Sequence, residues 1–287
     1  MKTSKKIHIY KKTVKAIDEQ FIGSAKELFK FKLAFYSHYL SKTTGVKNLF
    51  SFAKAKFRYQ NVVLSTRENT IDFWACLESY EPDFTYFLRT VLSQEKGNFI
   101  DVGGHIGRFT TLMAKNDWQV VTFEPIKSNY NLLMNNLNDN DCNQNAVVYN
   151  IGLGDKAVNQ NIYFDRKELG EASMINNSSA NDSENIKIEV FDELMKGYQF
   201  NDLTVVKIDV EGFEENVING MKDFLTTEKP LMVLELWSGN SEHVITYLKS
   251  LGYKRLHIFW FIEEKHGKYM DEMFNLYKRS NQNYQYS

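Results

Sequence analysis

Residues 98–109 read N-F-I-D-V-G-G-H-I-G-R-F and place an acidic side chain and several glycines in one short stretch. The apolar run at 98–102 is typical of a strand, and the apolar spacing from Phe109 onward is typical of a helix. A glycine-rich turn between a strand and a helix N-terminus aims backbone N–H groups at a ligand. The stretch therefore predicts a ligand-binding turn formed by Asp101, Gly103, Gly104, His105 and Gly107.

A second acidic residue lies at the end of the next predicted strand, residues 119–123. Glu124 and Pro125 follow that strand, roughly twenty residues after Gly103. At this spacing a carboxylate can accept hydrogen bonds from both hydroxyls of a ribose. The two motifs together predict a cofactor that contains a nucleoside.

The glycine spacing separates two kinds of nucleoside cofactor. The dinucleotide fingerprint is G-x-G-x-x-G, because its second and third glycines allow close approach of the pyrophosphate and of the helix. Counted from Gly103, those positions hold His105 and Arg108, so an NAD(P)-dependent oxidoreductase is only the alternative interpretation. The pattern D-x-G-x-x-x-G instead resembles motif I of class I S-adenosylmethionine-dependent methyltransferases, in which the acid at the strand end meets the cationic end of the cofactor.

The composition argues against several partners and locations. Thirty-five basic and 36 acidic side chains among 287 residues give a formal net charge of −1, so no global field attracts nucleic acid or an anionic membrane. Cys76 and Cys142 lack metal-binding spacing, which predicts a reduced, cytoplasmic setting. No run of residues has the length and apolarity of a transmembrane segment or a signal peptide.

Residues 1–56 are expected to form an N-terminal helical extension. Apolar side chains between residues 14 and 40 recur at the spacing of one helix or of a helix pair. Two interpretations remain open. The stripe packs on the main domain or on a second subunit of a homo-oligomer, or its aromatic and basic face makes a peripheral membrane contact. The stripe consists of Ile17, Phe21, Ala25, Leu28, Phe29, Phe35, Tyr36, Tyr39 and Leu40, with Lys26, Lys30 and Lys32 as its basic side chains.

Residues 57–97 are predicted to hold a hairpin and a helix that lead into the core. The runs 57–66 and 70–77 are rich in β-branched and aromatic residues, which is typical of strands. Pro82 is at an early position of a helix that extends to about residue 93.

Strands and helices alternate from residue 98 onward, which is the signature of a parallel sheet with crossover helices. Residues 160–192 break the alternation. The stretch 171–185 within them is rich in Asn and Ser, so it forms either a substrate lid or an ordinary surface loop. Further strands are expected at 146–151, 203–210 and 231–236, and two last strands at 254–262 and 269–277 around a tight turn at His266 and Gly267.

Five motifs, in the same order, are similar to those of the FkbM family of methyltransferases, which act mostly on oxygen. They are F-I-D-V-G-G-H-I-G at 99–107, F-E-P at 123–125, N-I-G-L-G-D at 150–155, V-V-K-I-D-V-E-G-F-E at 205–214 and P-L-M-V-L-E-L at 230–236. His105 and Gly104 depart from the pattern, because the family usually has Asn and Ala at these positions. The resemblance spans residues 98–237, about half of the chain.

The resemblance implies an α/β fold. We expect a doubly wound, Rossmann-like, seven-stranded and mostly parallel sheet with an antiparallel last strand. Residues 98–287 would form the class I methyltransferase domain.

The resemblance also implies S-adenosyl-L-methionine as the cofactor. The residues expected to bind it are Asp101, Gly103, Gly104, His105, Gly107, Glu124, Pro125, Asp155 and Asp209. Asp155 either touches the adenine region or caps a turn. The expected acceptor is a hydroxyl of a carbohydrate or small molecule, such as a glycan, a glycolipid or a secondary metabolite, and no nucleic acid is expected.

Methylation of an alcohol needs a general base, because the hydroxyl must lose its proton. In a doubly wound sheet such groups lie at the carboxyl ends of the strands, which makes Asp209, Glu211 and Glu235 the catalytic candidates and His105 a further one. Lys207 is expected to pair with a carboxylate. No metal is expected, since the fifth strand ends in Glu235-Leu236 where metal-dependent relatives have an Asp-Asn pair. A catalytically inactive nucleoside-binding module is the alternative from a different class.

Overall fold

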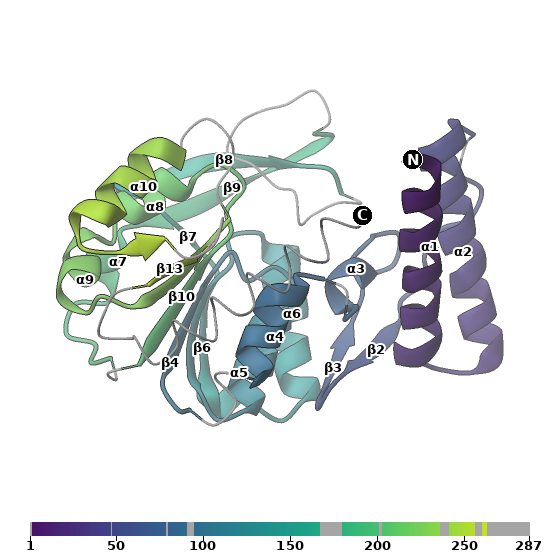
Figure 1. The fold of residues 1–287 in the computed structure, drawn as a ribbon, viewed down its shortest axis with the longest axis horizontal. Helices are drawn as coiled ribbons and strands as arrows, with labels where there is room; N and C mark the ends of the chain where they lie inside the picture. Colours follow the sequence, from purple (N-terminus) through teal and green to yellow (C-terminus); the bar gives the residue numbers. More distant parts are fainter. Residues whose placement is uncertain are drawn as a thin grey trace.

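The computed structural model describes residues 2–46, 48–78, 80–90, 95–166, 180–200, 203–235, 241–255 and 260–262. A central sheet lies between two layers of helices, and a further pair of helices lies outside one of these layers (Figure 1). The predicted α/β class with a parallel sheet is confirmed. No helix in this described part of the chain is both long and apolar enough to cross a bilayer.

Five parallel strands form the centre of the main sheet in the order β11-β10-β4-β5-β6. The chain starts in the middle, at β4, and continues to β5 and β6 on one side before it crosses to β10 and β11 on the other. Strand order therefore reverses beside β4, and ligands bind at such a switch point. These strands are β4 (Asn98–Val102), β5 (Gln119–Phe123), β6 (Ala146–Tyr149), β10 (Thr204–Ile208) and β11 (Leu231–Leu234).

Two antiparallel strands extend the sheet beyond β11. Strand β13 (Trp260–Ile262) pairs antiparallel with β11, and β12 (Lys254–Arg255) pairs antiparallel with β13. The prediction of one strand at 254–262 was therefore wrong, because the chain reverses within that range and forms two short strands. The strand expected at 269–277 lies outside the described residues.

The strands alternate buried side chains between the two faces of the sheet. Phe99 and Val205 join one apolar cluster, while Ile100 and Val206 join the other. Both faces are therefore apolar, as required when helices cover both. One face is covered by α4 (Pro82–Thr90), α5 (Arg108–Lys115) and α6 (Lys127–Asp139), and the other by α7 (Phe191–Leu194), α8 (Glu214–Asn219), α9 (Lys222–Thr227) and α10 (Ser241–Ser250) (Figure 1).

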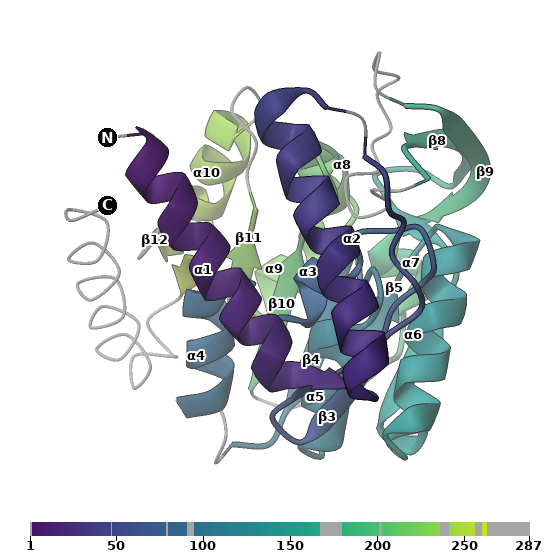
Figure 2. The ribbon, with the colours of Figure 1, turned by 90° about the vertical axis from the view of Figure 1, so that its right-hand side faces the viewer.

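The N-terminal region forms a helix pair, α1 (Lys2–Gln20) and α2 (Ala25–Thr44), joined through the short strand β1 (Phe21–Ile22). Helix α2 begins at a capping box, in which the Ser24 hydroxyl accepts from the Glu27 N–H and Glu27 accepts from the Ser24 N–H. It ends at Gly45, whose φ of +73° suits a left-handed helix cap. The pair lies outermost, beyond β2 (Lys56–Tyr59), β3 (Val62–Ser65) and α3 (Phe73–Cys76) (Figures 1 and 2).

Two expectations for this region were wrong. Residues 57–66 are not one strand but a complete hairpin, β2 and β3, which turns at Gln60 with φ +55°. Residues 70–77 contain the helix α3 in place of the second strand, and burial of Phe73, Ala75 and Cys76 in the core overrides their strand propensity.

The predicted apolar stripe of residues 14–40 mixes two faces of α2. Phe35 is buried as expected, but Phe29 and Leu40 are exposed. The buried face also contains Phe31 and Ala34, which the predicted stripe left out. The spacing was ambiguous because α2 has apolar side chains on both its inner and its outer face.

A second small sheet follows β6. Strands β8 (Val158–Phe164) and β9 (Asp182–Glu189) pair antiparallel, and β7 (Gly152–Leu153) pairs parallel with β9. The 3-10 turn η1 (Asn143–Asn145) precedes β6. Residues 182–185 of the predicted loop therefore belong to β9, and residues 167–179 lie outside the described part, so the choice between a lid and a surface loop stays open.

Candidate functional site

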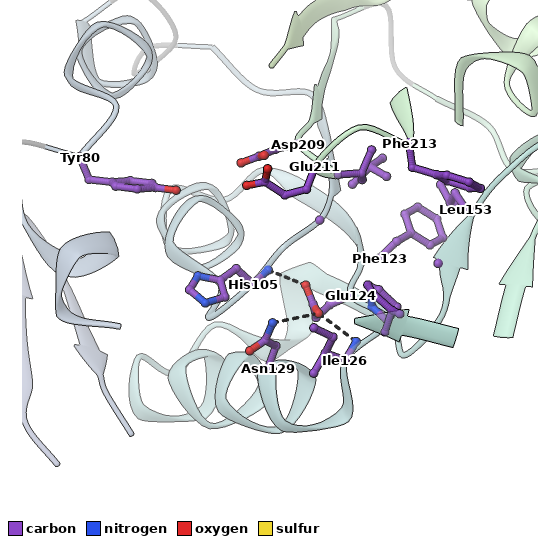
Figure 3. A pocket seen from close by; sticks show the side chains of 16 residues that line it. Tyr80, His105, Phe123, Glu124, Ile126, Asn129, Leu153, Asp209, Glu211 and Phe213 are labelled. Carbon is purple, nitrogen blue, oxygen red and sulfur yellow. Dashed lines mark hydrogen bonds between the residues drawn. The ribbon is translucent and has the colours of Figure 1, made fainter. Parts of the chain in front are cut away.

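A pocket lies at the carboxyl ends of β4, β5 and β10, where the strand order reverses (Figure 3). The space between the protein atoms there is about 700 Å³, including open solvent at the mouth of the pocket. Its wall combines apolar side chains with a few polar groups. The lining residues are Tyr80, Val102, Gly103, His105, Phe123, Glu124, Pro125, Ile126, Asn129, Gly152, Leu153, Ile162, Asp209, Val210, Glu211 and Phe213.

The turn after β4 brings two chain segments into contact. Gly103 has φ +89°, and its N–H donates to the Phe123 carbonyl oxygen at 2.9 Å. A Cβ at this position would lie 1.9 Å from the carbonyl oxygen of Asp209. Only glycine fits, and its small size lets the turn and the segment after β10 form one rim of the pocket.

The other two glycines of the turn serve helix packing. A Cβ on Gly104 would lie 2.4 Å from Thr122 Cγ2, and one on Gly107 would lie 2.6 Å from Leu133 Cγ of α6. Neither residue is among those that line the pocket. Their expected contact with a cofactor stays a prediction.

Glu124 is the buried acid of the pocket wall. Its Oε2 accepts from the His105 N–H at 2.8 Å, and its Oε1 accepts from the Ile126 N–H at 3.0 Å and from the Asn129 amide at 3.2 Å (Figure 3). Burial raises the pKa of Glu124 to about 7, although these donors lower it. A carboxylate has about four acceptor positions, so three protein donors leave room for a ligand hydroxyl.

His105 adopts φ +48°, a left-handed conformation that histidine tolerates better than most residues. Its Nε2 lies 3.9 Å from Oδ1 of Asp72. Burial lowers the pKa of His105 to about 4, although the Asp72 carboxylate raises it. The imidazole is therefore neutral at physiological pH.

Arg67, which follows β3, connects the segment between β3 and α3 with the wall of the pocket. Its guanidinium donates to both carboxylate oxygens of Asp72, at 2.8 and 2.7 Å, and to Oδ1 of Asn129 at 2.8 Å. Asn129 in turn donates to Glu124. The sequence contained no signal for Arg67 or Asn129, because neither belongs to a motif.

Asp101 is buried beside the turn but does not line the pocket. Its Oδ2 accepts from the Thr110 hydroxyl at 2.7 Å, while no donor among the described residues reaches Oδ1. Burial raises the pKa of Asp101, and the ammonium of Lys207 on the neighbouring strand counteracts this. An unpaired carboxylate oxygen at this position favours a cation nearby.

Lys207 pairs with carboxylates, as expected from the sequence. Its Nζ lies 2.7 Å from Asp209 Oδ2 and 3.7 Å from Glu81 Oε1. Burial alone would lower the pKa of Lys207, but these two carboxylates raise it well above its usual range. The ammonium thereby fixes the Asp209 side chain at the rim of the pocket.

Tyr80 forms the wall opposite the turn, although no sequence motif indicated it. The hydroxyl end of its ring points toward Asp209 and Glu211 (Figure 3). Burial raises the pKa of Tyr80, which keeps the phenol protonated. Tyr80 lies about twenty residues before the glycine turn in the sequence. Its contribution to the pocket wall is therefore visible only in the folded structure.

The remaining predicted residues fall into two groups. Glu211 lines the pocket with φ +51°. Asp155 lies outside it, where its Oδ1 accepts from the Asn216 amide at 3.3 Å. Glu235 does not line the pocket, but partial burial and the nearby Asp209 carboxylate raise the pKa of Glu235 to about 7.

A metal centre would need several ligating side chains around one point. Across the described ranges of the chain, no group of three or more His, Cys, Asp or Glu side chains is arranged to hold a metal ion. The expectation of a reaction without a required metal stays a prediction.

The pocket wall combines a buried acceptor with an apolar surface. Glu124 can accept from ribose hydroxyls, and the walls formed by Phe123, Leu153 and Phe213 suit a flat ring. Asp101, whose unpaired Oδ1 suits a positive charge, lies buried beside the turn and not in the pocket wall. A doubly wound sheet with a glycine turn after its first core strand and an acid after its second defines a nucleoside-binding domain of the class I methyltransferase type.

Comparison with protein families identifies the chain more narrowly than its fold and pocket do. Residues 101–255 match the family model described as Methyltransferase FkbM domain. This range is more than half of the chain, and the chain therefore belongs to the FkbM methyltransferase family. The resemblance found in the sequence is confirmed, and S-adenosylmethionine is the methyl donor of this family.

The comparison with solved structures finds methyltransferases at low similarity. An FkbM methyltransferase from Methylobacillus flagellatus KT is 18% identical with a TM-score of 0.44, and the match covers 62% of this chain and 46% of that one. A tRNA (uracil-54, C5)-methyltransferase from Pyrococcus abyssi, in complex with S-adenosyl-L-homocysteine, is 15% identical with a TM-score of 0.40 and coverage of 70% and 38%. The chain thus spans less than half of the length of either protein. No curated protein matches the chain.

Proposed function

We propose that the chain transfers a methyl group from S-adenosylmethionine to a hydroxyl group, and that the acceptor is a sugar in a glycan, a glycolipid or a secondary metabolite. The observation that carries this proposal is the position of Glu124, which is buried in the pocket wall opposite the carboxylates of Asp209 and Glu211 (Figure 3). One side of the pocket suits ribose, and the other offers groups that can accept a proton.

The cofactor supplies an electrophilic methyl group bound to a positively charged sulfur. Glu124 would hold the ribose hydroxyls, and the Gly103 turn would hold the cationic end close to Asp101. The apolar wall around Phe123 and Leu153 would exclude water from the adenine ring. Fixing both reactants in line in this way supplies much of the rate acceleration.

Asp209 is our proposed general base. It lies on the pocket rim, and the Lys207 ammonium donates to its Oδ2 at 2.7 Å. A hydroxyl that approaches Asp209 would pass its proton to the carboxylate as its oxygen attacks the methyl group. Glu211 and Glu235 are the neighbouring carboxylates that could accept the proton in its place.

The acidic side chains around Asp209 favour an uncharged acceptor. Asp209, Glu211, Glu235 and Glu81 are acidic, and Lys207 is already paired with two of them. A phosphate or carboxylate would be repelled, whereas a sugar hydroxyl can donate to any of these oxygens.

The proposal also includes a cytoplasmic location and a homo-oligomer. It further divides the chain into an N-terminal helical extension at residues 1–56, a hairpin and helix at 57–97, and the methyltransferase domain at 98–287.

A labelled-methyl transfer assay tests this function. The purified chain is incubated with methyl-labelled S-adenosylmethionine and with fractionated polysaccharide, lipid and small-molecule extracts of the source cell. We expect label in a carbohydrate-containing fraction, in a linkage that resists mild base, as an ether does. Binding of nicotinamide cofactors without methyl transfer would support the oxidoreductase, and binding of S-adenosylmethionine without transfer to any fraction would support an inactive module.

A further inference from the structure

The charge of the chain is divided unevenly between its N-terminal region and the rest. Residues 1–56 contain 13 lysines and only three acidic residues, Asp18, Glu19 and Glu27, so their formal charge is +10. Because the whole chain has a net charge of −1, the remaining residues have a net charge of −11. Such asymmetry within one chain indicates a polyanionic or anionic-surface partner for the basic part.

The same region contains most of the exposed apolar side chains. Within the described part of the chain, eleven large hydrophobic residues are exposed, and seven of them lie between residues 22 and 50. Leu49 is 75% exposed and Phe29 is 63% exposed. Clustered exposed apolar residues mark interaction sites, whereas scattered ones do not.

These side chains form one continuous surface. Phe29, Tyr36 and Leu40 are spaced by seven and four residues, which places them on the same side of α2. The segment after α2 folds back along the helix, because the Ser37 hydroxyl accepts from the Leu49 N–H at 2.7 Å and donates to the Asn48 side chain. Figure 2 shows α2 and this segment side by side. We call Phe29, Tyr36, Leu40, Val46, Leu49 and Phe50 the outer face of α2.

The outer face is not required to fold the chain. The opposite side of α2 supplies the core contacts, with Phe31, Ala34 and Phe35 all buried. Retaining six large exposed apolar side chains, three on an anchored helix and three in the segment after it, costs solubility without a folding gain. They are therefore available to a partner.

Four exposed lysines lie on α2 and in the segment after it. Lys26 and Lys30 lie on α2, Lys42 near its end and Lys54 beyond it, and all four side chains are exposed. The acid of this segment, Glu27, is engaged by Ser24 in the capping box. Lys32 is not part of the set, since it pairs with Asp18 at 2.8 Å.

We propose that the outer face of α2 docks the protein on an anionic lipid bilayer. The aliphatic and aromatic side chains enter the boundary between headgroups and acyl chains, while the lysines contact the headgroups. A symmetric dimer through this face would bring two strongly basic surfaces together. Nucleic acid would meet the lysines but would leave Leu40, Val46 and Leu49 without an apolar partner.

Vesicle flotation with the full chain tests the proposal, and its readout is independent of methyl transfer. Vesicles of phosphatidylcholine alone are compared with vesicles that contain phosphatidylserine. We expect binding to the anionic vesicles. High salt should weaken this binding, because salt screens the attraction between the lysines and the anionic headgroups. Each lysine near an anionic surface contributes roughly fivefold to partitioning, so the double variant Lys26→Glu with Lys30→Glu should bind at least about tenfold less.

Matched variants separate the contribution of the apolar side chains from that of the lysines. Phe29→Ser with Leu40→Ser should abolish binding, whereas Val147→Ser, an exposed apolar residue on β6, should not change it. Lys196→Glu, an exposed lysine after α7, is the control for charge. Melting temperatures of all variants establish that they are folded.

Three results would overturn the proposal. One is binding that is equal on neutral and anionic vesicles, and another is no binding to either. The third is a dimer in solution, detected by light scattering without vesicles, that the Phe29 and Leu40 substitutions dissociate.

Discussion

At the scale of single residues, the site depends on carboxyl groups in different surroundings. Glu124 is buried among backbone donors, Asp101 retains one unpaired oxygen, and Asp209 is fixed by Lys207. Burial and hydrogen bonds set the protonation of each group separately. The same residue type therefore has different protonation and hydrogen-bonding properties at these three positions.

Cofactor affinity should rise with pH because of Glu124. Its pKa of about 7 means that the carboxyl is mostly neutral at pH 6 and mostly ionised at pH 8. The ionised form is the better acceptor for ribose hydroxyls, so binding at pH 6 must first remove a proton. We expect about a tenfold gain in affinity from pH 6 to pH 8, measured by calorimetry.

Glu124→Gln is the control for this prediction, since the amide does not titrate. Its affinity should be lower and independent of pH over the same range. An equal rise in the variant would show that another group causes the pH dependence. His105 is not that group, because its pKa of about 4 keeps it neutral at both values.

Asp209→Asn should slow methyl transfer and leave cofactor binding almost unchanged. The amide cannot accept the acceptor's proton, and loss of a general base costs roughly 10²- to 10⁴-fold in rate. Single-turnover transfer and calorimetry measure the two effects separately. Asp141→Asn, an exposed residue outside the pocket, is the matched control, and turnover equal to wild type in the Asp209 variant would remove this residue as the base.

At the scale of elements, the pocket is held by contacts between segments that are distant in the sequence. Arg108 of α5 donates to the carbonyl oxygens of Ala75 and Leu77 at 2.7 and 2.8 Å, and its guanidinium stacks 4.1 Å from the Tyr59 ring centroid. This buried cation fixes the segment that leads to Tyr80. Arg108, one of the two residues that break the dinucleotide fingerprint, therefore has a structural role in this fold.

Gly103→Ala should destabilise the protein more than Gly197→Ala. Both glycines have φ above +80°, so both substitutions introduce left-handed strain of about 1–2 kcal/mol. At Gly103 the new Cβ would lie 1.9 Å from the Asp209 carbonyl oxygen, whereas at Gly197 it would meet nothing within 4 Å. Thermal unfolding measures the difference, and the Gly103 variant should also lose cofactor affinity.

Equal destabilisation in these two variants would contradict the close contact between the turn and the segment after β10. The comparison isolates that contact, because the strain in φ is common to both positions.

At the scale of the whole molecule, the N-terminal helices are part of the main core. Ile17, Phe31 and Phe35 belong to the same buried cluster as Phe57 and Phe99. The Phe31 ring lies within 5.6 Å of the rings of Phe21, Phe52, Phe57 and Phe73. The extension is therefore continuous with the layer that covers one face of the sheet.

Phe31→Ala should lower the free energy of unfolding by about 3–5 kcal/mol, because it leaves a cavity among packed rings. Phe29→Ala, two residues away and 63% exposed, should change it by no more than about 0.5 kcal/mol. Denaturant unfolding of the full chain measures both. A small effect at Phe31 would mean that the helix pair is only loosely attached.

The sequence predicted those features that depend on local patterns. Strand and helix alternation from residue 98, the turn at Gly103 and the acid at Glu124 were all visible, because each is specified by residues close together in the chain. The motif order also indicated the family. The pairing of Lys207 with a carboxylate followed from the position of a lysine within a buried strand.

Tertiary structure alone decided which distant residues complete the pocket. Tyr80 and Asn129 line the pocket and Arg67 donates to Asn129, and all three come from outside the recognised motifs. Contacts of residues 67–80 with α5 and α6 bring Arg67 and Tyr80 to the site. It also decided that residues 57–66 form a hairpin and that Phe29 faces solvent while Phe31 is buried. Local spacing permitted more than one arrangement in each case, and the choice was made by contacts between residues far apart in the chain.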